Sequence, residues 1–219
     1  MMLLTTQKPL SKEQIILIIP LNKKSNIVIK RSFDIIFSLT FLILFFPLVY
    51  LLVGLAIKLD SHGPILFIQK RKGLNGQYFS CYKFRSMYKN LACKQASKKD
   101  PRITRIGKLI RKTNIDELPQ FINVLSGNMS LVGPRPHPQW LNEQVSDKIP
   151  NYNMRSLIKP GITGLAQISG FRGETSTLDK MEGRVERDLW YIENWSMWLD
   201  IKIIWRTVIL LFKGDKNAY

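Results

Sequence analysis

The stretch RKTNIDELPQ, residues 111–120, places Asp116 directly before Glu117 in a chain that is otherwise basic, with 33 Lys and Arg residues against 16 Asp and Glu residues. Two acidic residues can simply begin a helix, because carboxylates accept hydrogen bonds from its free N–H groups and complement its dipole. They can also carry chemistry on an anion, as a nucleophile or as oxygen ligands of Mg²⁺. The surrounding sequence bears on both interpretations.

Basic residues flank this pair. The start of a helix near Asp116 would bring together carboxylates, free N–H groups and the Arg111 guanidinium, in a place where phosphate also binds. The GPRP motif at 133–136 adds Arg135 on a loop stiffened by a proline on each side, and a guanidinium fork there suits a diphosphate. We therefore expect a magnesium-dependent diphosphate site around the two carboxylates.

The formal net charge of +17 predicts an anionic partner, such as nucleic acid, phospholipid headgroups or a phosphorylated small molecule. A high isoelectric point is also typical of proteins that bind phosphate backbones. The alternative function is therefore a membrane-tethered basic protein that binds nucleic acid or phosphate without catalysis. That alternative explains the charge but gives no reason for the adjacent carboxylates.

The residue patterns of several other kinds of site are absent from the sequence. Cys81 and Cys93 form no disulfide framework, and the two histidines lie far apart, so a structural zinc site is not expected and a cytosol-facing location is favoured. The sequence contains no G-x-S-x-G elbow, no Walker A motif and no H-E-x-x-H motif.

One apolar segment, Ile35 to Ile57, contains 23 residues without a charge, which is long enough to cross a bilayer core. Pro47 lies near its middle, where a proline kinks or breaks a helix. Residues 1–34 carry a net charge of +4 and residues 58–219 carry +13, and a spanning helix would have to export one of these basic flanks. We expect a re-entrant helix broken at Pro47, with a spanning helix as the alternative.

The rest of the pattern predicts an α+β fold. Residues 64–87 have the pattern of two strands around an Asn-Gly turn, and a helix is expected from Asp116 to Gly127. Apolar residues at helical spacing predict an amphipathic helix over 177–195. We divide the chain into an N-terminal extension (1–29), a membrane-inserted broken helix (30–60) and a compact, cytosol-facing mixed α/β catalytic domain (61–219) with interfacial amphipathic helices.

The last segment, residues 198–214, mixes aromatic and basic side chains along one expected helix. The residues are Trp198, Trp205 and Phe212 with Lys202, Arg206 and Lys213. This mixture suits a helix at a membrane interface. A core helix with scattered aromatic residues explains it equally.

From Lys30 onward the chain resembles the bacterial sugar transferase family, the monotopic polyprenyl-phosphate phosphoglycosyl transferases. The motifs that carry the resemblance are KRSFD at 30, YKFRSM at 82, DPRITRIG at 100, DELPQFINVLSGNMSLVGPRP at 116, KPGITGLAQISG at 159 and DLWYIENWSMWLDIKII at 188. They keep the family's order over residues 30–219, as in a minimal catalytic form. One departure is Phe46, which stands where many members have a small polar residue before the proline.

The resemblance implies transfer of a sugar 1-phosphate from a nucleotide-activated sugar to a polyprenyl phosphate, with release of a nucleoside monophosphate. It implies that Asp116 is the nucleophile of a phosphosugar-enzyme intermediate and that Glu117, with Asp116, holds Mg²⁺. The substrate-binding residues that it implies are Lys83, Arg85, Arg111, Pro134 and Arg135.

The resemblance also implies partners and a location. The partners are a UDP-sugar, undecaprenyl phosphate and the lipids of the bacterial inner membrane, and no nucleic acid is expected. The catalytic domain would lie on the cytoplasmic face, and both a monomer and a homodimer stay open. The reaction would be the first membrane step of exopolysaccharide, O-antigen or glycoconjugate synthesis. RGET at 172 and KMEGRVERDLWYIENW at 180 are most similar to glucose 1-phosphate transferases, so we expect UDP-glucose, with UDP-galactose as the nearest competitor.

Overall fold

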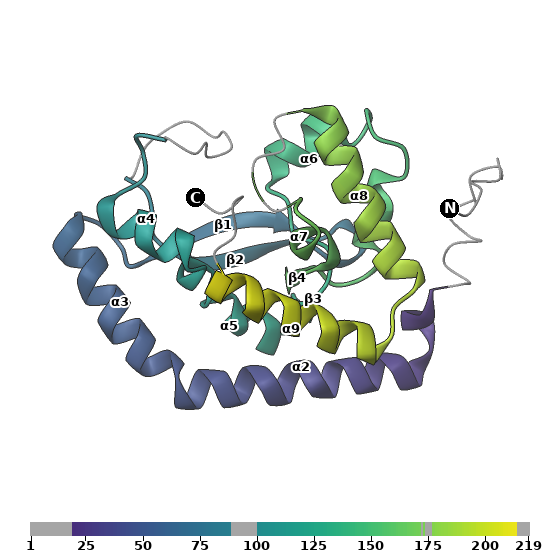
Figure 1. Ribbon diagram of the computed structural model, residues 1–219, viewed down its shortest axis with the longest axis horizontal. Helices are drawn as coiled ribbons and strands as arrows, with labels where there is room; N and C mark the ends of the chain where they lie inside the picture. Colours follow the sequence, from purple (N-terminus) through teal and green to yellow (C-terminus); the bar gives the residue numbers. More distant parts are fainter. Residues whose placement is uncertain (1–18, 89–99, 172, 174–176, 214–219) are drawn as a thin grey trace.

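The computed structural model describes residues 19–88, 100–171, 173 and 177–213. Residues 1–18 of the extension expected over 1–29 lie outside the described residues, as do Arg172, Glu174 and Thr175 of the RGET motif. Two helices that follow one another in the chain run along one side of the molecule, and the strands and the other helices form a body against them (Figure 1).

The two helices are α2 (Lys24–Leu44) and α3 (Phe46–Asp60), which meet at Phe45 with a bend of 58°. Pro47 lies in the first turn of α3, where a missing N–H does no harm, so the helix is interrupted at this proline as the sequence predicts. No single helix among the described residues is long and apolar enough to cross a membrane. The two helices of the bent pair, taken together, have the required length and apolar composition. Helix α2 begins before residue 30, and the expected three-part division of the chain stays a prediction.

Phe46, the departure from the family pattern, fills the inside of the bend. Its ring centroid lies 6.4 Å from that of Phe41 on α2 and 6.2 Å from that of Phe84 in the body. Aromatic pairs at this separation stabilise one another beyond simple burial. The bend therefore forms with a large side chain in this position.

The body holds the first half of α2 through one buried ion pair and several hydrogen bonds. The Lys30 ammonium lies 2.5 Å from Asp200, and Asp34 accepts a hydrogen bond from the backbone N–H of Leu131. Arg31 donates to the carbonyl oxygens of Val124 and Leu125 at 2.6 and 2.8 Å.

The body also holds the other end of the pair. The Arg85 guanidinium donates to the carbonyl oxygens of Ser61, at 2.7 Å, and His62. Asp60, the last residue of α3, accepts a 3.0 Å hydrogen bond from the Ile106 N–H at the start of the next helix. Both ends of α2–α3 are therefore fixed to one body.

The body begins with an antiparallel hairpin of β1 (Leu66–Lys72) and β2 (Tyr78–Phe84), which confirms the predicted pair of strands. The chain turns between them at the predicted Asn-Gly pair, where Asn75 and Gly76 both have positive φ. Lys72 pairs with Tyr78 at the tip of the hairpin, and Phe84 pairs with Leu66 at its base.

The acid pair lies after α4 (Arg105–Lys112), in a short 3-10 turn, η3 (Ile115–Glu117), and α5 (Gln120–Leu125) follows it. The single helix expected from residue 116 to 127 is thus divided. Pro119 precedes the first residue of α5, and Asn114 in the left-handed region precedes η3, so neither flank continues a regular helix.

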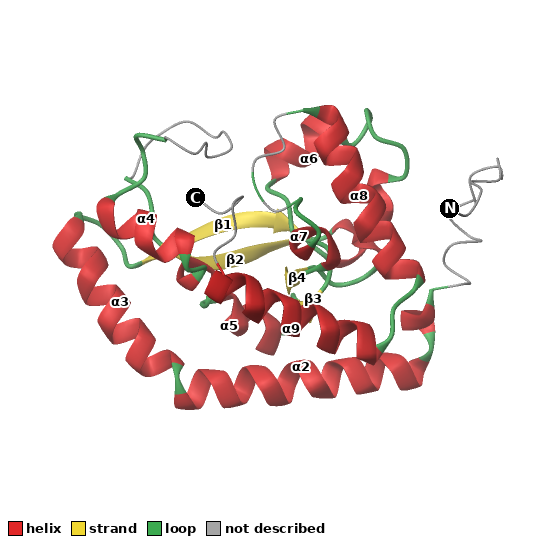
Figure 2. Cartoon of the chain, viewed as in Figure 1, coloured by secondary structure: helices red, strands yellow, loops and turns green. Residues whose placement is uncertain are grey.

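The other elements complete a mixed α+β body (Figure 2). Strands β3 (Ser130–Val132) and β4 (Gly161–Thr163) are parallel, and the described helices around them are α6 (Gln139–Val145), η4 (Tyr152–Leu157), α7 (Leu165–Ile168), α8 (Leu178–Glu193) and α9 (Met197–Lys213). The main core lies between α2, α5, α8, α9 and β3, around the fully buried Val124, Val132 and Ile203.

Helix α9 packs one side against the main core and exposes the other. Trp198, Trp205 and Phe212 are 63%, 65% and 88% exposed, while Asp200 and Ile203 supply its buried side. Exposed aromatic residues on this scale are typical of an interaction or membrane surface rather than of a packed interior. The interfacial interpretation of this segment is therefore favoured over the core interpretation.

Asn123 fixes α5 to the hairpin. Its completely buried side chain accepts a 3.0 Å hydrogen bond from the Tyr82 N–H and donates a 2.7 Å hydrogen bond to the Ser80 carbonyl. The amide thereby pairs with backbone groups of β2 as a neighbouring strand would. Since α5 follows the acid pair and β2 carries Lys83, Asn123 fixes the distance between them.

Replacing Asn123 with leucine is expected to lower the free energy of unfolding by about 2 to 6 kcal/mol, because two buried backbone groups lose their partners at about 1 to 3 kcal/mol each. Thermal or urea unfolding in detergent measures this loss. The control is Asn128→Ala, an exposed side chain that donates to the Ser126 hydroxyl and should cost less than about 0.5 kcal/mol. An Asn123→Leu protein as stable as the parent would show that this pairing does not stabilise the fold.

Candidate active site

Three elements converge on the acid pair. Strand β2 supplies Lys83, the 3-10 turn η3 supplies Asp116 and Glu117, and the loop after β3 supplies Arg135. All four side chains are buried or partly buried. The predicted Asp116, Glu117, Lys83 and Arg135 are thus brought together.

Glu117 lies between two cations. Its Oε1 atom is 2.6 Å from the Lys83 ammonium and also accepts from Arg135 Nη2, while Oε2 accepts from Arg135 Nη1 at 3.0 Å. Burial lowers the pKa of Lys83, although Glu117 raises it in part. Burial also tends to lower the pKa of Arg135, but the charge and hydrogen bonds of Glu117 leave that pKa above its ordinary value. Glu117 therefore keeps two charged groups beside its neighbour Asp116.

Asp116 is buried, and its carboxylate makes no hydrogen bond or ion pair with any residue in the described ranges. Desolvation raises its pKa above 3.8, and Glu117 adds to the rise, whereas Lys83, Arg111 and Arg135 oppose it. A helix-capping carboxylate would instead accept from backbone N–H groups near a helix start. The geometry leaves the Asp116 oxygens available to an incoming group.

The remaining predicted residues take different places. The Arg111 guanidinium lies 3.4 Å from the Ser86 hydroxyl, close enough to Asp116 to lower the pKa of that carboxyl. Arg85 does not join this group, because its guanidinium is bonded to the end of α3. Pro134 acts through its backbone, since its carbonyl accepts a 3.0 Å hydrogen bond from the Gly161 N–H.

Several contacts fix the loop that carries Arg135. Arg155 donates to the Arg135 carbonyl at 2.9 Å and is itself paired with Asp188 at 2.8 Å. Arg71 donates to the Pro136 carbonyl at 2.5 Å. The backbone of this loop also lies close to the backbone of residues 159–161. At Gly133 a Cβ atom would lie 2.5 Å from the Lys159 carbonyl oxygen, so only glycine fits there.

These supporting residues were not predicted from the sequence. Arg155 and Asp188 are 33 positions apart, and Asn123 contacts a strand about 40 positions earlier in the chain. The only local signal was the glycine and proline content around 133–136 and 160–164, which indicates close backbone packing but not the partners.

The donor set fits Mg²⁺ on chemical grounds. The described residues contain no group of three or more His, Cys, Asp or Glu side chains able to hold a metal. Mg²⁺ in phosphate-transfer sites is commonly held by one or two carboxylates, with substrate phosphates and water completing its shell. Asp116 and Glu117 supply two such carboxylates, and Glu117 would have to exchange part of its contact with Arg135 for the metal.

Known proteins are similar in sequence to this chain. A family model described as bacterial sugar transferase matches residues 25–214. The UDP-glucose:undecaprenyl-phosphate glucose-1-phosphate transferases of Escherichia coli K12 and Klebsiella pneumoniae are 51% and 52% identical over 199 residues, which is 89% of this chain and 42% of each relative. The undecaprenyl-phosphate glucose phosphotransferase of Komagataeibacter xylinus is 53% identical over 186 residues, 82% of this chain and 35% of the relative.

The chain spans less than half the length of these three curated relatives. Within that part, the match runs from the start of α2 through α9 and includes every residue around the acid pair. The extent of the match and the level of identity lead to one conclusion: the chain belongs to the bacterial sugar transferase family.

Proposed function

We propose that this protein transfers hexose 1-phosphate, most simply glucose 1-phosphate, from a UDP-sugar to undecaprenyl phosphate and releases UMP, through a phosphosugar intermediate on Asp116. The observation that carries this proposal is the buried, unbonded Asp116 carboxylate beside the cation-bound Glu117. The names of the relatives support the substrates, and they give no support to a nucleic-acid-binding protein. The reaction would begin the synthesis of an exopolysaccharide, O-antigen or glycoconjugate at the membrane.

In the first step, an Asp116 oxygen attacks the phosphorus that carries the sugar. A bond forms between that oxygen and phosphorus, and the phosphorus–oxygen bond to UMP breaks, so UMP leaves with the electron pair. Burial favours this attack, because a poorly solvated carboxylate has little water to lose.

In the second step, a phosphate oxygen of undecaprenyl phosphate attacks the same phosphorus. The bond to Asp116 breaks, and the carboxylate returns to its starting state with no net proton taken up. Both steps bring an anion to an anionic phosphoryl group, so positive charge must be present in advance. Lys83, Arg111 and Arg135 provide that charge from the protein.

Mg²⁺ would be held by Glu117 and Asp116 together with phosphate oxygens of the donor. When bound, the metal neutralises phosphoryl oxygens and so lowers the repulsion that the attacking carboxylate meets. Arg135, released in part from Glu117, is then free to contact the diphosphate with its guanidinium fork.

We place the bent pair α2–α3 in the cytoplasmic leaflet of the bacterial inner membrane as a re-entrant segment. Large apolar residues on it are exposed, among them Ile43, Leu44, Leu51 and Leu55. The contacts at both ends of the pair support re-entry over spanning, because a spanning helix would have to detach one end from the body. The exposed Trp198 and Trp205 of α9 suit the interface with lipid headgroups.

A donor panel tests the reaction. Detergent-solubilised protein is incubated with undecaprenyl phosphate and UDP-glucose, UDP-galactose or UDP-N-acetyl sugars, with Mg²⁺ or with EDTA, and UMP is measured. Mg²⁺-dependent UMP release that is greatest with UDP-glucose is expected. The proposal fails if no UDP-sugar gives UMP release.

Replacing Asp116 with asparagine should lower kcat by a factor of about 1,000 or more, because an amide cannot form the acyl phosphate. Unfolding should occur at the same temperature or higher, since the raised pKa means that the charged carboxylate weakens the fold at neutral pH. Asp147→Asn, on an exposed aspartate, serves as the control and should change neither property. A folded Asp116→Asn protein with near-normal UMP release would return Asp116 to a structural role.

The activity should fall on the acid side with a pKa above 3.8. Asp116 must be ionised to attack, and burial raises the pKa of its carboxyl, so protonation removes activity at a higher pH than for an ordinary aspartate. The pH dependence of kcat/KM for the UDP-sugar measures this. A profile that stays flat down to the ordinary range of aspartate, about 3.9, would contradict the assignment.

The ends of the bent pair should lie on one side of the membrane. Cysteines placed at Lys23 and Lys213, after the native cysteines are replaced with serine, should both resist a membrane-impermeant reagent added to intact cells. Pro47→Leu should expose Lys23 in part of the population, because a continuous helix of this length is then available to span. Labelling at Lys23 alone in the parent protein would mean that the helix spans.

A further inference from the structure

One turn of α2 contacts both of the segments that carry the acid pair and Arg135. Arg31 and Asp34 are three positions apart on this helix, so their side chains leave it on the same face. The reaction steps proposed above make no use of either residue. Their partners nevertheless lead to the site from two directions.

Arg31 fixes the end of α5. Its guanidinium donates to the Val124 carbonyl at 2.6 Å and to the Leu125 carbonyl at 2.8 Å. These are the last residues of α5, where a helix has carbonyl groups without intrahelical partners and where its dipole favours a cation. Since α5 is six residues long and begins three residues after Glu117, Arg31 holds the far end of the short helix that follows the acid pair.

Asp34 fixes β3. Its Oδ1 atom accepts a 3.0 Å hydrogen bond from the Leu131 N–H and a 3.1 Å hydrogen bond from the Ser130 hydroxyl. Asp34 and Ser130 are only 2% and 1% exposed, so water does not compete for these contacts. Strand β3 ends three residues before Arg135, and Asp34 therefore holds the strand from which the Arg135 loop begins.

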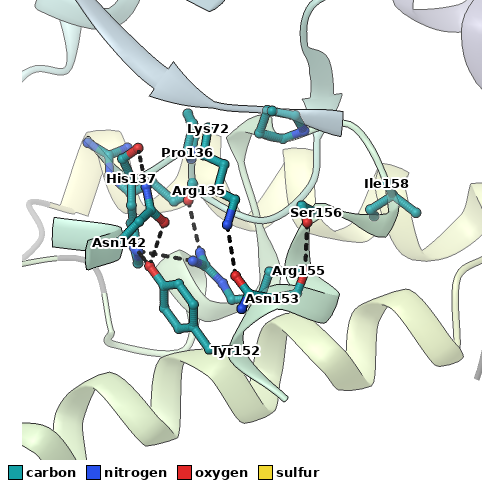
Figure 3. Close-up of a pocket in the computed structure, with 12 residues that line it drawn as sticks. Lys72, Arg135, Pro136, His137, Asn142, Tyr152, Asn153, Arg155, Ser156 and Ile158 are labelled. Carbon is teal, nitrogen blue, oxygen red and sulfur yellow. Dashed lines mark hydrogen bonds between the residues drawn. The ribbon is translucent and has the colours of Figure 1, made fainter. Parts of the chain in front are cut away.

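The loop after β3 passes this position on to Arg135. The Gly133 N–H donates to the Thr163 carbonyl of β4 at 2.9 Å, and Pro134 restricts the backbone that follows. On the far side of the loop, Arg155 donates to the Arg135 carbonyl at 2.9 Å, as Figure 3 shows. A segment held at each of these points moves together with the strand that precedes it.

The two directions meet at the contact between Glu117 and Arg135. The contacts form a closed path from Arg31 through α5 to Glu117, across to Arg135, and back through β3 to Asp34. Protein interiors are close-packed and transmit small displacements. A change in either contact with α2 therefore alters the separation between Glu117 and Arg135.

We propose that Arg31 and Asp34 are positioning residues for the transfer reaction, and that they set the distance between the acid pair and Arg135. The inference rests on the proposed function in one respect, that Asp116 reacts while Arg135 contacts the diphosphate. Neither Arg31 nor Asp34 touches the substrate, because each acts through the segment that it holds. Helix α2, whose apolar side is exposed, thereby also determines the geometry of the polar site.

The first measurement is the kcat/KM for UDP-glucose of Asp34→Ala and Arg31→Met. Each should lower it by about tenfold to 100-fold, the effect of a misplacement of about 1 Å at a reacting centre. Asp34→Asn keeps an acceptor oxygen in the same place and should restore most of the activity. The control is Asn26→Ala on the same helix, where Asn26 donates at 2.8 Å to the carbonyl of Pro20, and it should leave kcat/KM unchanged.

The second measurement separates positioning from general support of the fold. Each variant is combined with Arg135→Lys, which keeps the charge and loses the guanidinium fork. If Asp34 acts through Arg135, Asp34→Ala should have little further effect on kcat/KM in the Arg135→Lys protein. It should also lower the unfolding temperature less there than in the parent, because the contact with Glu117 is already weakened. Ser130→Ala and Arg31→Met carry the test if Asp34→Ala does not fold.

The two proposals fail in different ways. A parent protein that releases no UMP from any UDP-sugar defeats the proposed function, and the unfolding temperatures of the same variants then decide whether α2 is coupled to Arg135. An active parent whose folded variants keep full kcat/KM defeats only the positioning roles. Losses of kcat/KM that are equal in the parent and in the Arg135→Lys protein also overturn them, as do additive shifts in unfolding temperature.

Discussion

The contact of Glu117 with Lys83 and Arg135 is the interaction on which the arrangement of the site depends. One carboxylate holds an ammonium from β2 and a guanidinium from the loop after β3, so two distant parts of the chain meet at η3. These cations also lower the pKa of Asp116 against the effect of burial. Without them a second buried carboxylate next to Glu117 would take up a proton, and a protonated acid cannot attack phosphorus.

Buried charge of this density is tolerated only when the scaffold holds each partner in place, because one lost partner leaves an uncompensated charge. The scaffold holds the partners of Glu117 in place on both sides of η3. Asn123 ties α5 to β2, and the contact between Arg155 and the Arg135 carbonyl fixes the loop. Arg85, expected at the phosphates, instead fixes the end of α3 to the body. The bent pair α2–α3 and the site are therefore parts of one packed unit.

The sequence predicted the features that depend on local patterns. The hairpin followed from alternation and an Asn-Gly turn, the break from Pro47, and the convergence of Glu117 and Arg135 from residue types near a proline-rich loop. It did not predict that the acid pair would lie in a 3-10 turn, because the positive φ of Asn114 is a conformation rather than a composition. Nor did it predict contacts such as Arg155 with Asp188, which only the folded chain brings together.

The central claim is that Asp116 becomes covalently bonded to the phosphorus of the donor. The most direct measurement is mass spectrometry of the protein after brief incubation with UDP-glucose and Mg²⁺ in the absence of undecaprenyl phosphate, followed by mapping of the modified peptide. The account predicts an added mass of one hexose phosphate on the peptide that contains Asp116, which disappears when undecaprenyl phosphate is supplied. UMP release at full rate with no modified peptide, or a modification on a peptide without Asp116, would contradict it.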